Sequence, residues 1–183
     1  MRGLASLSGT GFAVIPTDYR QRPPNIQLDV EVPAGGATYS VLYTNDDILS
    51  VTSNVIPTSI TRVTTTATVV SPLHGLNTGD LVWVFNTGYP NFQATSLDGG
   101  PFAITVTDQN TFTYAVANSG VTTGYQFSYY IGAHVFPAAA LTAQTTRKDG
   151  NIAFPCSAVI LNVTAYTGPG PVLMQVTQGP SSA

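Results

Sequence analysis

Charged side chains are scarce in this 183-residue chain: Asp, Glu, Lys and Arg together make up 8% of it, against about 25% in an average soluble domain. The net charge is −3 and the only lysine is Lys148, so no basic patch is present that would bind a nucleic-acid backbone. Hydrophobic residues nevertheless make up 43% of the chain. A Thr-, Ser-, Asn- and Gln-rich surface with few charges is typical of a protein that is largely covered by partner subunits.

Cysteine and long apolar runs are also nearly absent. The single cysteine, Cys156, cannot form an internal disulfide, and its place between Pro155 and an alternating apolar run predicts a buried, unreactive thiol. No run of about 18 apolar residues is present that would span a bilayer, and the N-terminal residues lack the apolar segment of a signal peptide. We therefore expect synthesis in the cytoplasm and no membrane partner.

Side chains for metal binding and nucleophilic catalysis are equally scarce. His74 and His134 are the only histidines, and neither is accompanied in the sequence by the ligands of a metal site or the members of a catalytic triad. The run Asn45, Asp46 and Asp47 lacks the glycine hinge and the spaced acidic ligand of a calcium loop. An Asx turn is the better interpretation of this run.

Carboxylate pairs and phosphate-binding loops are missing as well. A glycosidase needs two placed carboxylates, but Glu31 is the only glutamate and several aspartates stand beside glycine in expected turns. Gly9 and Gly11 begin a G-x-G pattern, but Val14 occupies the position of the third glycine and no helix is expected to follow. We expect no enzymatic activity, no catalytic residue, no metal and no cofactor.

The chain instead carries short alternating apolar and polar runs separated by Gly, Pro, Asn and Asp, without apolar residues at helical spacing. Ile26 to Val32 and Thr38 to Thr44 each place their apolar residues on one face, and we expect these two strands to form a hairpin. A polar turn is expected at 147–151. Further strands are expected at 63–70, 81–85, 102–107, 111–117, 125–131, 138–142, 158–165 and 172–178, with hairpins between 102–107 and 111–117 and between the last two.

The pattern predicts an all-β fold with a discontinuous domain. Residues 1–24 carry turn residues and no period, so we expect an extended N-terminal arm. Strands near the two ends of the chain need each other, whereas the middle forms a self-contained set. We expect a β-sandwich or jelly-roll-like domain over 25–49 and 133–183, with a small β domain inserted at 50–132.

Segments of this discontinuous domain resemble a family of small structural proteins of tailed bacteriophages. The resembling segments are YSVLYTNDD at 39–47, HVFP at 134–137, DGN at 149–151, AVILNVTA at 158–165 and VLMQVTQG at 172–179. In that family a strand that ends in an aspartate-containing turn is followed by a strand of the type "rAIRLNVTA" and then by "GTVTLTVIQG". The resemblance covers about residues 25–49 and 133–179.

The resemblance implies a head decoration or cement protein that lies on the capsid surface of the virion, binds the major capsid protein lattice and a copy of itself, and stabilises the capsid. The inserted block resembles a small β module of phage tail and fibre proteins through LHGL at 73–76, Gly79-Asp80 and DQNTFTY at 108–114. A tail or head-to-tail component is therefore an alternative.

Nine residues are candidates for contacts with other molecules. For the capsid or a second copy they are Arg2, Arg20 and Arg22 in the arm, and Tyr39, Tyr43 and Phe136 in the sandwich. A further alternative function is a glycan-binding host-recognition module, because exposed aromatic rings stack on sugar faces. Its expected platform comprises Trp83, Tyr89 and Phe92, around the loop 86–100, although core packing is the more common fate of aromatic residues.

Overall fold

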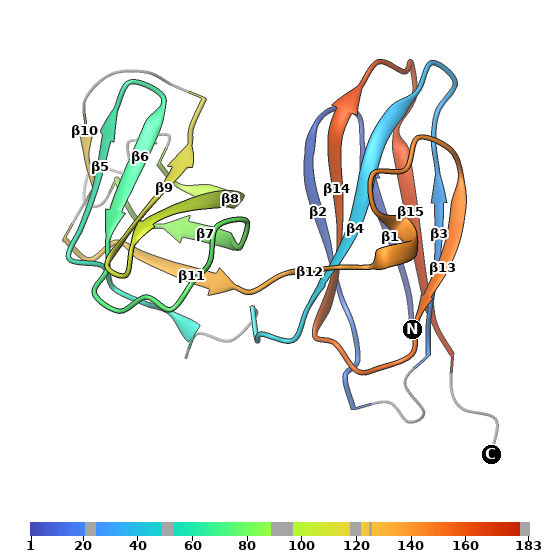
Figure 1. Ribbon diagram of the computed structural model, residues 1–183, viewed down its shortest axis with the longest axis horizontal. Helices are drawn as coiled ribbons and strands as arrows, with labels where there is room; N and C mark the ends of the chain where they lie inside the picture. The colour runs from blue at the N-terminus through green and yellow to red at the C-terminus, as the bar shows by residue number, and fades with distance from the viewer. Residues whose placement is uncertain (21–24, 49–52, 89–96, 118–121, 125, 180–183) are drawn as a thin grey trace. The chain divides into compact units, whose positions relative to one another are not determined.

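The computed structural model describes residues 1–20, 25–48, 53–88, 97–117, 122–124 and 126–179 (Figure 1). Over these residues the regular elements are β-strands and short 3-10 turns, without an α-helix, which confirms the all-β prediction. The strands divide into two compact units, one of residues 1–46 with 135–183 and one of residues 47–134. The two ends of the chain thus build one unit, and the continuous middle segment builds the other.

The unit built from the two ends is a sandwich of two four-stranded antiparallel sheets. One sheet has the order β1-β15-β3-β13 and the other has the order β12-β4-β14-β2 (Figure 1). The bounds are β1 (Arg2–Leu7), β2 (Gly11–Pro16), β3 (Ile26–Glu31), β4 (Ala37–Thr44), β12 (Phe136–Pro137), β13 (Lys148–Ile152), β14 (Ala158–Tyr166) and β15 (Val172–Gln178).

The core of the sandwich follows from alternation along the strands. In β3 the residues Ile26, Leu28 and Val30 are buried while the residues between them are more exposed, because successive side chains point to opposite faces of a strand. Leu161 on β14 and Met174 on β15 belong to the same cluster of buried residues. The core therefore lies between the two sheets and joins strands from both ends of the chain.

The expectation of an extended N-terminal arm over 1–24 is wrong. Residues 2–7 form β1, which pairs with β15, and residues 11–16 form β2, which pairs with β14. Ala5 and Ile15 are buried in the sandwich core, and an ideal Cβ atom at Gly3 would lie 2.5 Å from Cγ2 of Ile15, so glycine permits close packing here. Neither run alternates regularly between apolar and polar residues, and pairing with distant strands makes it a strand. Residues 21–24 lie outside the described residues.

Two expected hairpins are also wrong. β3 pairs with β13 and β15, whereas β4 pairs with β12 and β14, so β3 and β4 lie in different sheets. The last two strands, β14 and β15, are separated in the same way. In each case the two consecutive strands cross from one sheet to the other, because their apolar faces then meet across the common core.

Two local predictions in the last third of the chain differ from the structure. The expected polar turn at 147–151 lies largely within strand β13, and the expected strand at 138–142 contains the 3-10 helix η2 (Ala139–Leu141). Lys148 and Asp149 lack the apolar alternation of a strand, but they pair with Val30 and Asp29 of β3 at the edge of the sheet. Tertiary pairing overrides the weak local preference of this segment.

The middle unit is a curved antiparallel sheet of seven strands in the order β10-β5-β6-β9-β8-β7-β11. Val55, which precedes β5, forms an isolated bridge with Tyr130 of β11, with N–O distances of 2.8 and 2.9 Å. The bridge joins the segment before β5, which is next to one end of the strand order, to β11 at the other end. The sheet therefore curves as in a partly closed barrel. The bounds are β5 (Ser59–Val63), β6 (Thr66–Val70), β7 (Leu81–Phe85), β8 (Gly99–Asp108), β9 (Thr111–Ala115), β10 (Thr122–Thr123) and β11 (Tyr129–Ala133).

The middle unit has its own core and one unexpected turn. Its core comprises Ile60, Ala67, Val69, Val82, Val84, Leu97, Ile104, Phe112, Tyr114, Val116 and Tyr130. The expected hairpin between β8 and β9 is confirmed. The run 63–70, expected as one strand, instead divides into β5 and β6 at a turn in which Thr64 adopts a φ of 55°. Threonine disfavours this conformation, so the sequence carries no signal for the turn.

Ile15 and Leu4 allow a direct test of the N-terminal strands. Ile15 is 6% exposed and Leu4 is 67% exposed, so Ile15→Ala should lower the free energy of unfolding by about 2 to 4 kcal/mol and Leu4→Ala by less than about 0.5 kcal/mol. Urea unfolding followed by the reaction of the buried Cys156 with a thiol reagent measures this unit. Equal stability of both variants and the wild type would restore the arm interpretation.

Tyr39 lies in the sandwich core without exposed surface. Its hydroxyl donates a hydrogen bond to the carbonyl oxygen of Thr146 at 3.0 Å. Burial raises the pKa of Tyr39 from 10 to about 12, and the carboxylates of Asp149 and Asp29 act in the same direction. The folded state therefore disfavours the phenolate form, which the unfolded chain accepts near the ordinary pKa.

This raised pKa predicts a loss of stability in alkali. The contribution of Tyr39 to the free energy of unfolding is complete below pH 10 and is lost as the pH rises from 10 towards 12. Tyr39→Phe keeps the ring, so between about pH 9 and pH 11 its free energy of unfolding should fall about 1 kcal/mol less than that of the wild type. Urea unfolding followed by circular dichroism measures both slopes, and parallel slopes would contradict the prediction.

Candidate interaction surface

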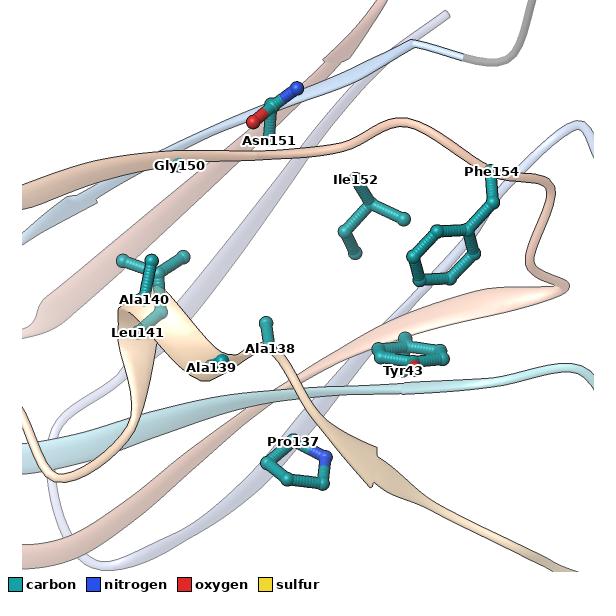
Figure 2. A pocket seen from close by; sticks show the side chains of 10 residues that line it. All are labelled: Tyr43, Pro137, Ala138, Ala139, Ala140, Leu141, Gly150, Asn151, Ile152 and Phe154. Carbon is teal, nitrogen blue, oxygen red and sulfur yellow. The ribbon is translucent and has the colours of Figure 1, made fainter.

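An apolar groove opens at one edge of the sandwich, beside the edge strands β12 and β13 (Figure 2). Its volume is about 240 Å³, and it is lined by Tyr43, residues 137–141, residues 150–152 and Phe154. These residues come from two regions that are far apart in the sequence, Tyr43 on β4 and residues 137–154. The fold therefore creates the groove, and no single motif encodes it.

The helix η2 forms one wall of the groove. Leu141 is 1% exposed and belongs to the sandwich core. An ideal Cβ atom at Gly150 would lie 2.9 Å from Cδ1 of Leu141, so the glycine lets η2 approach β13 closely. The backbone N–H of Ala138 donates to the carbonyl oxygen of Val41 on β4 at 2.9 Å. The wall is thus fixed to both sheets.

Three aromatic rings line and flank the groove. Tyr43 stacks on Phe136 with ring centroids 5.6 Å apart and meets Phe154 edge to face with centroids 4.9 Å apart. Tyr43 and Phe154 face each other in Figure 2. Phe136 is 45% exposed and Phe154 is 42% exposed, so water covers large apolar faces that a partner would bury. Aromatic residues of this kind are enriched where proteins bind each other.

Charge is distributed unequally between the two sheets of the sandwich. Strands β2, β4, β12 and β14 contain no Asp, Glu, Lys or Arg, whereas the other sheet carries charged residues on three strands. These residues are Arg2 on β1, Asp29 and Glu31 on β3, and Lys148 and Asp149 on β13. Only the sheet of β1, β15, β3 and β13 therefore offers ionic contacts to a partner through its strands.

An ion-pair group lies on this charged sheet. The guanidinium of Arg147 donates to both carboxylate oxygens of Asp29, at 2.9 Å from Nη2 and 3.3 Å from Nε, and lies 3.6 Å from Glu31. These carboxylates raise the pKa of Arg147. Asp149 stands directly opposite Asp29 in the pairing of β13 with β3. Like charges at opposite positions destabilise a sheet, so Arg147 offsets part of this repulsion.

Two of the three arginine candidates lie within the described residues. Arg2 lies on β1 and donates to Oε1 of Gln175 at 2.9 Å. Arg20 places its guanidinium carbon 5.5 Å from the ring centroid of Tyr19. Arg22 lies outside the described residues. Their expected role in ordering an arm has no support in the structure, because the arm is replaced by two strands.

The structure brings together two of the three aromatic candidates of the sandwich. Tyr43 and Phe136 meet at the groove. Tyr39 is wrong as a contact residue because its side chain is fully buried. Phe154 completes the aromatic group, and sequence reasoning missed it because it stands outside every alternating run. In the sequence, the only feature that could have marked Phe154 as a contact residue is its aromatic side chain directly before Pro155.

The expected glycan platform is only partly within the described residues. Trp83 is half-buried on β7, opposite Ile131 of β11. On the same two strands Phe85 and Tyr129 stack with ring centroids 5.1 Å apart. Tyr89 and Phe92 lie outside the described residues, so the three-residue platform stays a prediction.

Both histidines hold backbone groups of the middle unit. Nδ1 of His74 accepts a hydrogen bond from the backbone N–H of Leu76 at 3.1 Å, so Nε2 is the donor to the carbonyl oxygen of Asp108, also at 3.1 Å. Nε2 of His134 lies 3.1 Å from the carbonyl oxygen of Gly75. Across the described parts of the chain, no three His, Cys, Asp or Glu side chains gather in a way that would hold a metal ion.

The remaining sequence candidates are structural in character. Cys156 is 2% exposed, as expected, and burial raises the pKa of its thiol. The backbone N–H of Asp46 donates to Oγ1 of Thr44 at the end of β4. Within the described segments, no helix has the length and apolar character needed to cross a membrane.

Comparison with known proteins adds little to this picture. No family model matches the sequence, and no curated protein matches it. The fold is similar to part of a solved structure, the phage phi92 endosialidase, with a TM-score of 0.35 and 22% sequence identity over 80% of this chain and 20% of that chain. The chain thus spans about a fifth of the length of that protein. A similarity of this extent carries no argument about function.

Proposed function

We propose that this protein is a structural subunit of a tailed-bacteriophage particle that attaches to neighbouring subunits through the open edge of its sandwich. The more specific role is head decoration: binding to the lattice of the major capsid protein and to further copies, at the capsid surface. The sequence segments at 39–47 and 134–179 that resemble phage structural proteins support this assignment. The proposed role requires no catalytic residue, metal, cofactor, nucleic acid or membrane.

The observation that carries the proposal is the exposed aromatic group at the groove. Tyr43, Phe136 and Phe154 form a contiguous apolar surface beside a free sheet edge, in a protein with 8% charged residues. Complete burial of a phenylalanine side chain contributes about 1.5 to 3 kcal/mol. Ordering of the partners offsets much of this gain.

Such a contact suits a lattice better than an isolated pair of molecules. One weak interface leaves two free molecules largely dissociated, but subunits held on a repeating surface present their interfaces at a high effective concentration. Many weak contacts together then resist expansion of the particle. The proposed contribution of this protein is adhesive and depends on its number of copies.

Substitution of the two exposed phenylalanines tests the contact. Phe136→Ser combined with Phe154→Ser should reduce retention on phage particles prepared without this protein by at least about tenfold, because two buried apolar side chains are lost. Ile56→Ser is the matched control, since Ile56 is 63% exposed and belongs to the middle unit. Retention is measured by co-sedimentation. Retention of the double variant at the level of the control would remove the groove from the proposal.

The number of copies in the particle tests the location. A decoration protein of a capsid lattice should be present in hundreds of copies per particle, which a quantitative gel of purified virions measures against the major capsid protein. A dozen copies or fewer would instead assign the protein to the tail or the head-to-tail connection. Retention on host polysaccharide without incorporation into particles would overturn the structural role in favour of glycan recognition.

A further inference from the structure

We propose that the sheet β1-β15-β3-β13 continues from one copy of the protein to the next, with β1 of one copy pairing antiparallel with β13 of its neighbour beside the groove. The occupant of the open edge is therefore a second copy of this chain. The inference deepens the proposed function and rests on it, since it names the partner of the same edge.

Both strands have a free edge. β1 pairs only with β15 and β13 pairs only with β3. Over the residues that the structure describes, neither strand forms a backbone hydrogen bond on its outer side. An unpaired strand edge presents a row of N–H and C=O groups to another strand, and addition of a strand supplies their hydrogen bonds.

The direction of the two edge strands fits this continuation. All neighbours in the sheet are antiparallel, so the two edges of a four-stranded sheet run in opposite directions. A copy displaced along the sheet then brings its β1 antiparallel to β13, without reversing the molecule. Such a head-to-tail contact is heterologous, and it generates a ring or an open row of subunits.

The side chains of the two edges also match. Ala5 of β1 and Ile152 of β13 face the sandwich core, and Gly3 and Gly150 lie on the same sides of their strands, two residues away. Next to the groove, Pro137, Ala139 and Ala140 are exposed. The inner side of an added β1 is already covered by β2 of its own copy, where Gly3 packs against Ile15. It is therefore β2 of the added copy that comes to lie beside this shelf of small apolar residues.

Charge complementarity selects this pairing over its alternatives. Arg2 is the only charged residue of β1, and Asp149 makes no ion pair among the described residues. When the core-facing sides of the two strands are aligned, some registers place Arg2 of one copy opposite or diagonal to Asp149 of the next copy. In these registers the two side chains are close enough to form a cross-strand ion pair. Pairing of β13 with β13 would bring two Asp149 carboxylates together. Pairing of β1 with β1 would leave the groove uncovered.

Charge reversal on each edge tests the contact in solution. Arg2→Glu and Asp149→Lys should each weaken the concentration-dependent association of the full chain by about tenfold, because an attractive pair becomes a repulsive one. An equimolar mixture of the two variants should associate like the wild type, since the two reversed positions then face each other. Sedimentation velocity measures the association of each sample.

Controls separate the contact from effects on folding. Asp108→Lys reverses an exposed charge in the middle unit, outside the edge strands of the sandwich, and should leave association unchanged. Cys156 in each variant should remain protected from thiol reagents, as in the wild type. A variant that exposes the thiol is replaced by Arg2→Gln or Asp149→Asn, which should weaken association about threefold.

Three results would overturn the inference. The first is a wild type that stays monomeric up to its solubility limit. The second is that Arg2→Glu weakens association and Asp149→Lys does not. The third is that the mixture of the two variants fails to associate. Retention on particles tests the proposed function separately. A monomer in solution that is still retained on particles would remove the second copy as the partner and leave the structural role intact.

Discussion

Burial of one face of every long strand in a common core is the constraint on which the sandwich depends. The core residues Ile26, Leu161 and Met174 come from β3, β14 and β15 and are fully removed from water. The hydrophobic effect supplies the driving force, since the chain has a single cysteine and therefore no internal disulfide. Consecutive strands cross from sheet to sheet because this arrangement lets their apolar faces meet.

The same constraint determines where the molecule is open. Strands β1, β13, β12 and β2 are at the edges because the central positions are occupied by β15, β3, β4 and β14. At the edge of β12 and β13 the 3-10 helix and aromatic rings line the groove, and Phe136 and Phe154 are exposed there. The interaction surface thus results from the way the two sheets terminate at this edge. The charged residues of the strands lie on only one of the two sheets.

Strand positions could be predicted well wherever the local pattern was strong. The expected strands at 81–85 and 172–178 coincide with β7 and β15, and that at 158–165 is one residue shorter than β14. The pattern failed for β1, β2 and β13, which are edge strands. An edge strand has fewer neighbours and needs fewer apolar residues, so its sequence carries a weaker signal.

The all-β class, the burial of Cys156 and the scarcity of charge follow from the amino-acid sequence, because composition and a period of two are local properties. Tertiary structure alone decided which strands share a sheet, that Tyr39 lies in the core, and that Tyr43, Phe136 and Phe154 meet at one groove. The period shows which side chains share a face of a strand, but it does not show which distant strand that face meets. Contacts between residues far apart in the chain depend on the packing of the whole core, and no local pattern records them.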